Sequence, residues 1–68
     1  MPIINVEMFA GRSNDKKREL VAALTEAYLS VCGGNSDGVH VLIRDVDTHD
    51  WGVRGMLCAD IITKKHSS

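Results

Sequence analysis

Residues 2–14 read PIINVEMFAGRSN, and this stretch decides how the chain begins to fold. Within it, Ile3–Phe9 alternates in side-chain direction. The alternation places Ile4, Val6 and Met8 on one face, and Ile3, Asn5, Glu7 and Phe9 on the other. A period of two is typical of a strand with one buried face. We therefore expect a half-buried strand over Ile3–Phe9.

A long helix is predicted directly after this strand. Ala10–Arg12 interrupts the alternation, and Ser13 or Asn14 then offers a side-chain oxygen that caps the free N–H groups of a helix. The predicted helix runs from about Asn14 to Cys32 and carries an apolar stripe. The members of the stripe are Leu20, Val21, Leu24, Ala27, Tyr28 and Val31. Gly33-Gly34 ends the helix, because glycine tolerates the left-handed conformation that closes helix ends.

A second strand and a glycine-punctuated segment follow the helix. Val39–Val46 has one apolar face with Val39, Val41 and Ile43, and an opposite face with His40, Leu42 and Arg44. A strand, a long helix and a strand in this order are typical of a right-handed parallel crossover. Asp45–Met56 is turn-like, and we expect Leu57–Thr63 to return as a short closing strand. The predicted fold class is α+β: a β-α-β unit with parallel strands and a short C-terminal hairpin or strand, forming one domain over residues 1–68.

The chain is short for a protein that folds alone. It has 68 residues, 44% of them hydrophobic, with a single Phe, a single Trp and a single Tyr. A domain of this size buries only about 60% of the surface that its unfolded chain exposes. One helix also covers one face of a two-stranded sheet, whereas parallel sheets are normally covered on both faces. We therefore expect other chains to supply the missing cover, so that the protein is an oligomer.

Charge and cysteine content argue against several classes of function. The net charge is −1 with both signs interspersed, which predicts no nucleic-acid and no membrane partner. The two cysteines, Cys32 and Cys58, are too few for a disulfide framework and are not spaced like metal ligands. His49 and Asp50 are adjacent, but the sequence offers no third ligand at a spacing that suits a metal site. The basic run Lys16–Arg18 is expected to be a solvated helix face. No metal is expected, and the expected compartment is a reducing cytoplasm.

The order and position of these features resemble the 4-oxalocrotonate tautomerase family. The resemblance covers nearly the whole chain. It includes Pro2 at the start of the first strand, the Gly11-Arg12-Ser13 step before the helix, and Trp51 followed by glycine after the second strand. The resemblance implies a tautomerase-like fold, an isomerase without metal or organic cofactor that serves in aromatic degradation, and a homohexamer arranged as a trimer of dimers.

Pro2 is the candidate general base, because removal of Met1 would turn its nitrogen into a free secondary amine. A free α-amine titrates at about pH 7.7–8.0, and a prolyl amine is ordinarily more basic still. Burial and nearby cations disfavour the charged form and lower the pKa. An uncharged prolyl nitrogen is then a general base at neutral pH. If Met1 stays in place, Pro2 has no basic nitrogen and this chemistry is lost.

Arg12 and Trp51 are candidates through the family resemblance. In the family, the arginine that matches Arg12 interacts with the substrate carboxylate, and a guanidinium can hold a carboxylate through two parallel hydrogen bonds. Trp51 resembles the aromatic residue that walls the active site and keeps the prolyl amine desolvated. The alternatives are a solvated arginine and an interface aromatic, since tryptophan is enriched at interfaces.

His40 is where the sequence departs from the family pattern. The best-known members have an arginine at this strand position, which acts at a neighbouring subunit's site. Histidine adds charge only when it is protonated. Arg44, on the same strand face, is a candidate substitute cation for substrate binding. The alternatives are an interface role for His40 and a surface ion pair between Arg44 and Asp45 or Asp47.

Three hypotheses of function follow. The first is an enol–keto tautomerase whose partner is a small carboxylate substrate, an unsaturated 2-hydroxy or 2-oxo acid such as 2-hydroxymuconate. The second is an enzyme that uses the same amine for hydration–dehalogenation or decarboxylation. Relatives of this fold carry out these reactions, in some cases with the amine protonated. The third is a non-catalytic binding module or assembly subunit, including an inactive member of a mixed oligomer. The departure at His40 suits the last of these.

Overall fold

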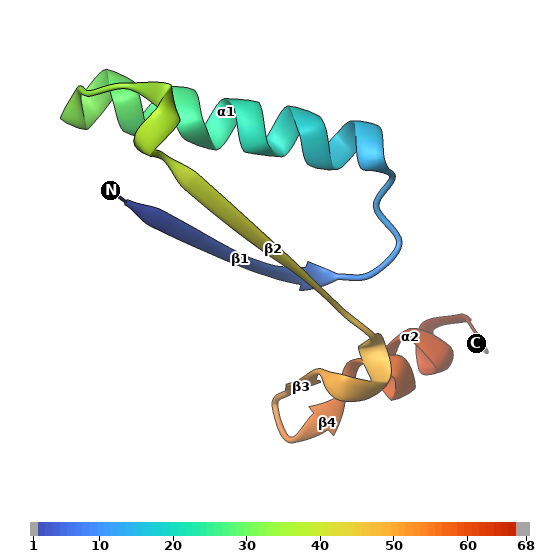
Figure 1. Cartoon of the computed structure of the whole chain (residues 1–68). Helices are drawn as coiled ribbons and strands as arrows, with labels where there is room; N and C mark the ends of the chain where they lie inside the picture. The colour runs from blue at the N-terminus through green and yellow to red at the C-terminus, as the bar shows by residue number, and fades with distance from the viewer. Residues whose placement is uncertain (1, 67–68) are drawn as a thin grey trace.

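The structure is a computed structural model that describes residues 2–66 of the chain, with side chains as far as Ile62. Figure 1 shows the elements in order. They are β1 (Ile3–Phe9), α1 (Asn14–Cys32), the short 3-10 helix η1 (Ser36–Gly38), β2 (His40–Val46), a second 3-10 helix η2 (Thr48–Asp50), β3 (Gly52–Val53), β4 (Met56–Leu57) and α2 (Cys58–His66). The predicted bounds of β1 and α1 are confirmed, and β2 begins one residue later than predicted. Among the described residues, neither helix is long and apolar enough to cross a membrane.

β1 and β2 form a parallel two-stranded sheet, as predicted for a crossover unit. Their register runs without a break along the whole of β1. The ladder is closed at both ends by backbone hydrogen bonds: the N–H of His40 donates to the carbonyl of Pro2, and the N–H of Ala10 donates to the carbonyl of Val46, each at 3.0 Å. β1 is therefore held extended over its full length, and its two ends lie at opposite ends of the sheet.

α1 begins and ends at the capping residues that the sequence indicates. Ser13 is the N-cap, and its side-chain oxygen accepts a hydrogen bond from the backbone N–H of Lys16 at 3.2 Å. At the other end, Gly33 has a φ of +74° and donates its N–H to the carbonyl of Leu29 at 2.9 Å. A residue with a side chain would be strained at this φ, so glycine allows the chain to leave the helix here.

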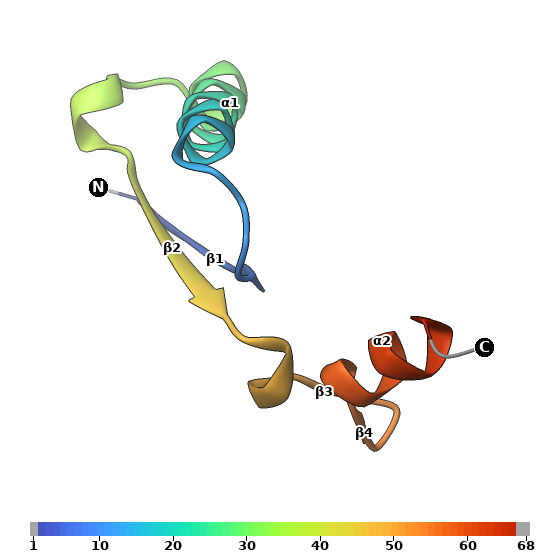
Figure 2. The same ribbon diagram turned by 90° about the vertical axis from the view of Figure 1, so that its right-hand side faces the viewer.

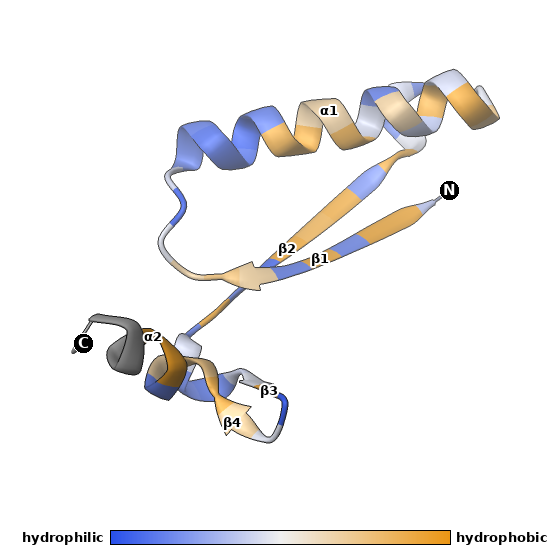
Figure 3. Cartoon of the chain, turned by 180° about the vertical axis from the view of Figure 1, so that it is seen from behind, coloured by the Kyte–Doolittle hydropathy of each residue, from blue (hydrophilic) through white to orange (hydrophobic). Residues whose placement is uncertain are grey.

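α1 lies over one face of the sheet and leaves the other face bare within a single chain (Figures 1 and 2). The apolar residues beneath the helix are half-buried, and they are Ile4, Val6, Met8, Val41 and Ile43. On the bare face, Ile3 and Leu42 keep 61% and 49% of their surface exposed. Figure 3 shows that hydrophobic residues run along both strands. Since parallel sheets are normally covered on both faces, this face is available for cover from outside the chain.

The predicted apolar stripe of α1 is only partly correct. Its half-buried members are Leu20, Leu24 and Tyr28, and its exposed members are Val21, Ala27 and Val31. The 19-residue helix is about 28 Å long, whereas a seven-residue strand spans roughly 23 Å. The last turns of α1 therefore extend beyond the strands (Figure 1). Val31 keeps 83% of its surface exposed because it lies in these last turns, beyond the cover of the described strands.

The prediction of a closing strand over Leu57–Thr63 is wrong, whereas the predicted C-terminal hairpin is confirmed. β3 and β4 pair antiparallel over two residues each, around a turn in which Arg54 and Gly55 have φ of +56° and +77°. β4 ends at Leu57 because its partner strand β3 is only two residues long. The chain then enters α2, whose first N–H, that of Cys58, donates to the carbonyl of Trp51 at 2.8 Å.

A single chain buries little of its own surface. Of the side chains that the structure describes, only Cys58 and Ala59 are buried. The accessible surface is 5342 Å², whereas a compact protein of 7.4 kDa exposes roughly 4,200 Å². The radius of gyration is 15.8 Å, against about 11 Å for a compact chain of this length. The chain by itself is therefore an incomplete fold, in keeping with the predicted oligomer.

One ion pair joins α1 to the sheet. The Lys17 Nζ lies 2.5 Å from Asp45 Oδ2, and the two side chains are 27% and 37% exposed. The other ion pairs among the described side chains are local and more exposed, such as Arg18 with Asp15 inside the first turns of α1. The Lys17–Asp45 pair therefore fixes the start of the helix over the end of β2.

We expect Lys17→Met to lower the free energy of unfolding by about 0.5–1 kcal/mol, because the pair is partly shielded from water. The matched control Arg18→Met breaks an exposed pair within one helix and should cost about 0.3 kcal/mol. Urea denaturation at a fixed chain concentration measures both. A double-mutant cycle with Asp45→Asn isolates the pair. A cycle with no coupling energy would contradict the assigned role.

Candidate active site

Pro2 lies at the free end of β1, beside the start of β2. It is half-buried, and its carbonyl accepts the hydrogen bond from the N–H of His40. The His40 side chain is exposed and lies on the bare face of the sheet, in register with Ile3. Of the predicted substrate-binding residues, His40 is the one that the same chain places beside Pro2.

Arg12 lies beyond the other end of β1, in the turn that leads into α1. Gly11 before it has a φ of +119°, a conformation that strains any residue with a side chain. Ser13 after it is the N-cap of α1. The backbone is thus fixed on both sides of Arg12. The Arg12 side chain is exposed and forms no ion pair with any described side chain.

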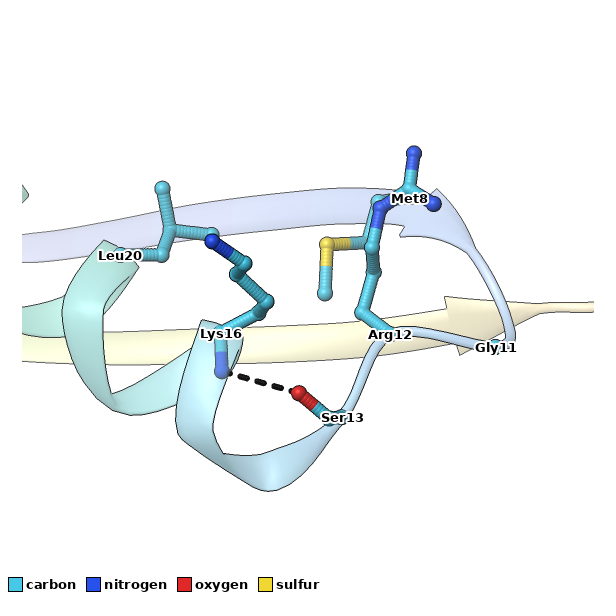
Figure 4. A pocket seen from close by; sticks show the side chains of 6 residues that line it. All are labelled: Met8, Gly11, Arg12, Ser13, Lys16 and Leu20. Atoms are coloured by element: carbon cyan, nitrogen blue, oxygen red, sulfur yellow. Dashed lines mark hydrogen bonds between the residues drawn. The ribbon is translucent and has the colours of Figure 1, made fainter.

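An open hollow of about 630 Å³ lies beside Arg12, between β1 and the first turns of α1 (Figure 4). Its lining consists of Met8, Gly11, Arg12, Ser13, Lys16 and Leu20. Met8 and Leu20 make its walls apolar, while Arg12 and Lys16 bring two positive charges to it. None of the described carboxylates lines it. This composition suits a small molecule with an anionic head and an apolar body.

Trp51 lies at the same end of the sheet as Arg12. Its ring meets the ring of Phe9, the last residue of β1, edge to face, with centroids 4.6 Å apart and planes at 68°. The backbone carbonyl of Trp51 accepts a hydrogen bond from the N–H of Cys58 at the start of α2. Trp51 is half-buried, so one part of the indole packs inside the chain and another part remains open to a neighbour or a ligand.

The turn before Trp51 is capped by a carboxylate. Asp47 Oδ1 accepts a hydrogen bond from the backbone N–H of His49 at 2.8 Å and lies 2.7 Å from its ring Nδ1. These hydrogen bonds hold the pKa of the Asp47 carboxyl below its ordinary value, because they stabilise the ionised form. Within the described residues, no group of three His, Cys, Asp or Glu side chains is gathered that would hold a metal ion.

Arg44 lies on the bare face of the sheet, in register with Glu7 of β1. The suggested ion pair of Arg44 with Asp45 or Asp47 is wrong. Asp45 lies on the opposite face and pairs with Lys17, and Asp47 caps η2. Arg44 is exposed and has no ion pair among the described side chains. Its charge is therefore available to a group brought by another molecule.

The structure divides the predicted site residues into two groups. Pro2 and His40 lie at one end of the sheet, and Arg12 and Trp51 lie at the other. β1 separates them by seven residues, which corresponds to roughly 23 Å. A substrate of a few carbon atoms cannot reach across that distance. One chain therefore does not bring its own Pro2 and Arg12 to one substrate, and their joint role remains a prediction.

Lys16 is the charged lining residue that the sequence pattern does not reveal. The expectation of a solvated face over Lys16–Arg18 is correct for Lys16 and Arg18, whose side chains are 70% and 72% exposed, and wrong for Lys17, which pairs with Asp45. The solvated Lys16 also lines the open hollow. The available signal is the direction of helical side chains, which lean back toward the N-terminus of the helix. A residue three positions after the cap therefore reaches toward the turn that carries Arg12.

Comparison with known proteins agrees with this fold. The tautomerase enzyme family matches residues 2–61 of the chain. A probable tautomerase of Staphylococcus haemolyticus (strain JCSC1435) is 37% identical over 60 residues, which cover 88% of this chain and 97% of that protein. A crystal structure of a 4-oxalocrotonate tautomerase homologue is 35% identical, with a TM-score of 0.81, and the match covers 88% of this chain and 95% of that one.

The chain is thus a small β-α-β protein in which the helix covers one face of the parallel sheet. It belongs to the tautomerase family, as the match from Pro2 to Ile61 shows. Homologues with this fold form oligomers. One example is a fused 4-oxalocrotonate tautomerase solved as an asymmetric trimer, which is 30% identical with a TM-score of 0.85 over 90% of this chain and 50% of that one.

The Asp47 cap leads to a prediction for Trp51. Asp47→Ala removes the acceptor of both contacts from His49, so we expect η2 to loosen and the emission of Trp51, the only tryptophan, to shift to longer wavelength. The matched control is Asp50→Ala in the same turn, whose described side chain accepts no hydrogen bond. Equal shifts in the two variants would contradict the role of the cap.

The pH dependence of the Asp47 cap has a defined sign. Because the folded pKa of Asp47 is lowered, the stabilisation is fully present above the ordinary carboxyl value of 3.8 and is lost as pH falls through the lowered value. The emission of the parent protein should therefore approach that of Asp47→Ala only below pH 3.8. A fluorescence titration of both proteins measures this, and convergence near neutral pH would contradict it.

Proposed function

We propose that the protein is an enol–keto tautomerase acting on a small unsaturated 2-hydroxy or 2-oxo acid such as 2-hydroxymuconate. The observation that carries the proposal is the family match over residues 2–61, which includes Pro2 at its first position. Further support comes from the hollow beside Arg12, because its two cations and apolar walls suit a carboxylate on a hydrocarbon body.

Pro2 is the proposed proton carrier. With Met1 removed, its ring nitrogen is a secondary amine at the end of an ordered strand, and the hydrogen bond from His40 to its carbonyl holds it there. In dry, cation-rich surroundings the amine is uncharged near neutral pH. It takes a proton from the enol hydroxyl and returns a proton to a carbon further along the conjugated system. One amine performs both steps, so the reaction needs no cofactor.

Arg12 and Trp51 are the proposed partners of that amine. The Arg12 guanidinium holds the substrate carboxylate through two hydrogen bonds and stabilises the negative charge that develops when the proton leaves. Trp51 excludes water from the amine, and a drier site strengthens these interactions. Arg44 and His40 are exposed on the bare sheet face, from which they are proposed to bind substrate held by a neighbouring chain.

The proposed active site is shared between chains. The whole length of β1, roughly 23 Å, lies between Pro2 and the turn that carries Arg12, so we propose that the amine of one chain meets the guanidinium of another. The uncovered sheet face and the excess accessible surface favour such an assembly. We propose a homohexamer arranged as a trimer of dimers.

Replacement of the proline tests the proton carrier. In protein whose intact mass shows that Met1 has been removed, Pro2→Ala should lower kcat on 2-hydroxymuconate or an arylpyruvate enol by about 10²-fold, because alanine supplies a more mobile primary amine. Unchanged secondary structure and oligomer mass serve as controls. An unchanged rate, or retention of Met1 in the active protein, would contradict the mechanism.

Mixing two inactive variants tests the shared site. Pro2→Ala and Arg12→Ala are each expected to be nearly inactive, but co-assembled chains can form sites with the proline of one variant and the arginine of the other. A random equal mixture should recover about one quarter of the parent rate, because each intact site needs one chain of each kind in a given orientation. No recovery in mixed oligomers verified by native mass spectrometry would show that the site lies within one chain.

A further inference from the structure

The hollow beside Arg12 contains a second cation. Lys16 lines it from the first turn of α1, and Arg12 lines it from the preceding turn. In Figure 4 the two side chains extend to the same side of this turn, with the Met8 side chain between them. Leu20 lies one helical turn beyond Lys16 and forms the far wall. The positive charges of Arg12 and Lys16 therefore lie beside the apolar walls that Met8 and Leu20 form.

Lys16 differs from its two basic neighbours in α1. The Lys17 Nζ forms an ion pair with Asp45 Oδ2 at 2.5 Å. Arg18 holds Asp15 at 2.7 Å and borders a different part of the helix surface. Among the described side chains, Lys16 forms an ion pair with Glu19 alone.

The contact between Lys16 and Glu19 leaves Lys16 available. The Lys16 Nζ lies 3.6 Å from Glu19 Oε2, and the two side chains are 70% and 69% exposed. An exposed pair at this distance contributes little free energy because water competes with it. An anion that enters the hollow can therefore replace Glu19 as the partner of the ammonium group at small cost.

We propose that Lys16 is a substrate-binding residue that holds the anionic head of the substrate together with Arg12. The identity of this ligand as a substrate rests on the proposed tautomerase function. Arg12 binds the carboxylate through its planar fork, and the Lys16 ammonium, a compact charge with three donors, binds the oxygen on the adjacent carbon or the same carboxylate. The conjugated body of the substrate lies against Met8 and Leu20.

This arrangement defines a class of ligand. The head carries one carboxylate, with or without a neighbouring oxygen, because two cations and no described carboxylate line the hollow. The body is apolar for the few carbons that follow, because Met8 and Leu20 supply the apolar part of the lining. Its unsaturation follows from the proposed tautomerase reaction and not from the lining. A neutral molecule with the same body lacks the group that Lys16 and Arg12 recognise.

Calorimetric titration of the full-length protein with sorbate, a six-carbon conjugated monocarboxylate that cannot tautomerise as an enol, tests the proposal. Lys16→Met should raise the Kd for sorbate about fivefold, whereas the matched control Arg18→Met, which removes the same charge, should change it by less than about twofold. Glu19→Gln frees Lys16 and should lower the Kd by about twofold. Neutral sorbamide should bind parent and Lys16→Met equally, and Lys16→Arg should bind sorbate nearly as the parent does.

Thermal unfolding is the control that tests whether each variant is folded. Lys16 lies in the first turn of α1, where a positive charge is mildly unfavourable, so its removal is not expected to lower the Tm. Equal weakening by Lys16→Met and Arg18→Met would reduce the effect to general charge and overturn the proposal. An unchanged Kd in Lys16→Met, or no sorbate binding by the parent, would also overturn it. Specific sorbate binding in a protein that turns over no enol would instead overturn the tautomerase proposal and leave Lys16 as a carboxylate ligand.

Discussion

The parallel pairing of β1 with β2 is the constraint on which the rest of the structure depends. A parallel pair requires the chain to return to its starting end, and α1 makes that return across one face of the sheet. The same pairing holds β1 extended from Pro2 to Ala10. The residue that begins the strand and the turn that follows it are thereby kept a full strand length apart.

This separation links the chemistry of the family to its assembly. The half-buried Pro2, directly before β1, carries the proposed amine, and the hollow at the other end of β1 carries the proposed cations. In the proposed mechanism, proton transfer needs a residue from each end. The uncovered sheet face, the exposed end of α1 with Val31 and the extended shape all leave surface that another chain can cover. In the proposed assembly, association serves both stability and function, because the surfaces left uncovered in one chain lie next to Pro2 and Arg12, which are proposed to work with residues of other chains.

Short polar contacts then hold the segments around the end of the sheet at which Arg12 lies. Lys17 and Asp45 bind the first turn of α1 to the end of β2, and Asp47 caps the turn that precedes Trp51. Trp51 in turn packs on Phe9 at the end of β1. These contacts join the segments before and after β2 to one end of the sheet. The positions of Arg12 and Trp51 are therefore properties of the whole β-α-β unit and not of their own loops alone.

The sequence by itself determined the elements whose signals are local. Alternation defined Ile3–Phe9, and a cap at Ser13 or Asn14 together with Gly33-Gly34 bounded α1. The proline, arginine and tryptophan positions indicated the tautomerase family. Only the tertiary structure decided which side chains meet. Where a closing strand was expected, β4 ends at Leu57 because its partner β3 has only two residues, and α2 follows. Val31 stays uncovered because the helix is longer than the strands. The tertiary structure also separated Pro2 from Arg12 and brought Lys16 beside Arg12. These outcomes depend on lengths and distances in space, which periodicity along a chain does not contain.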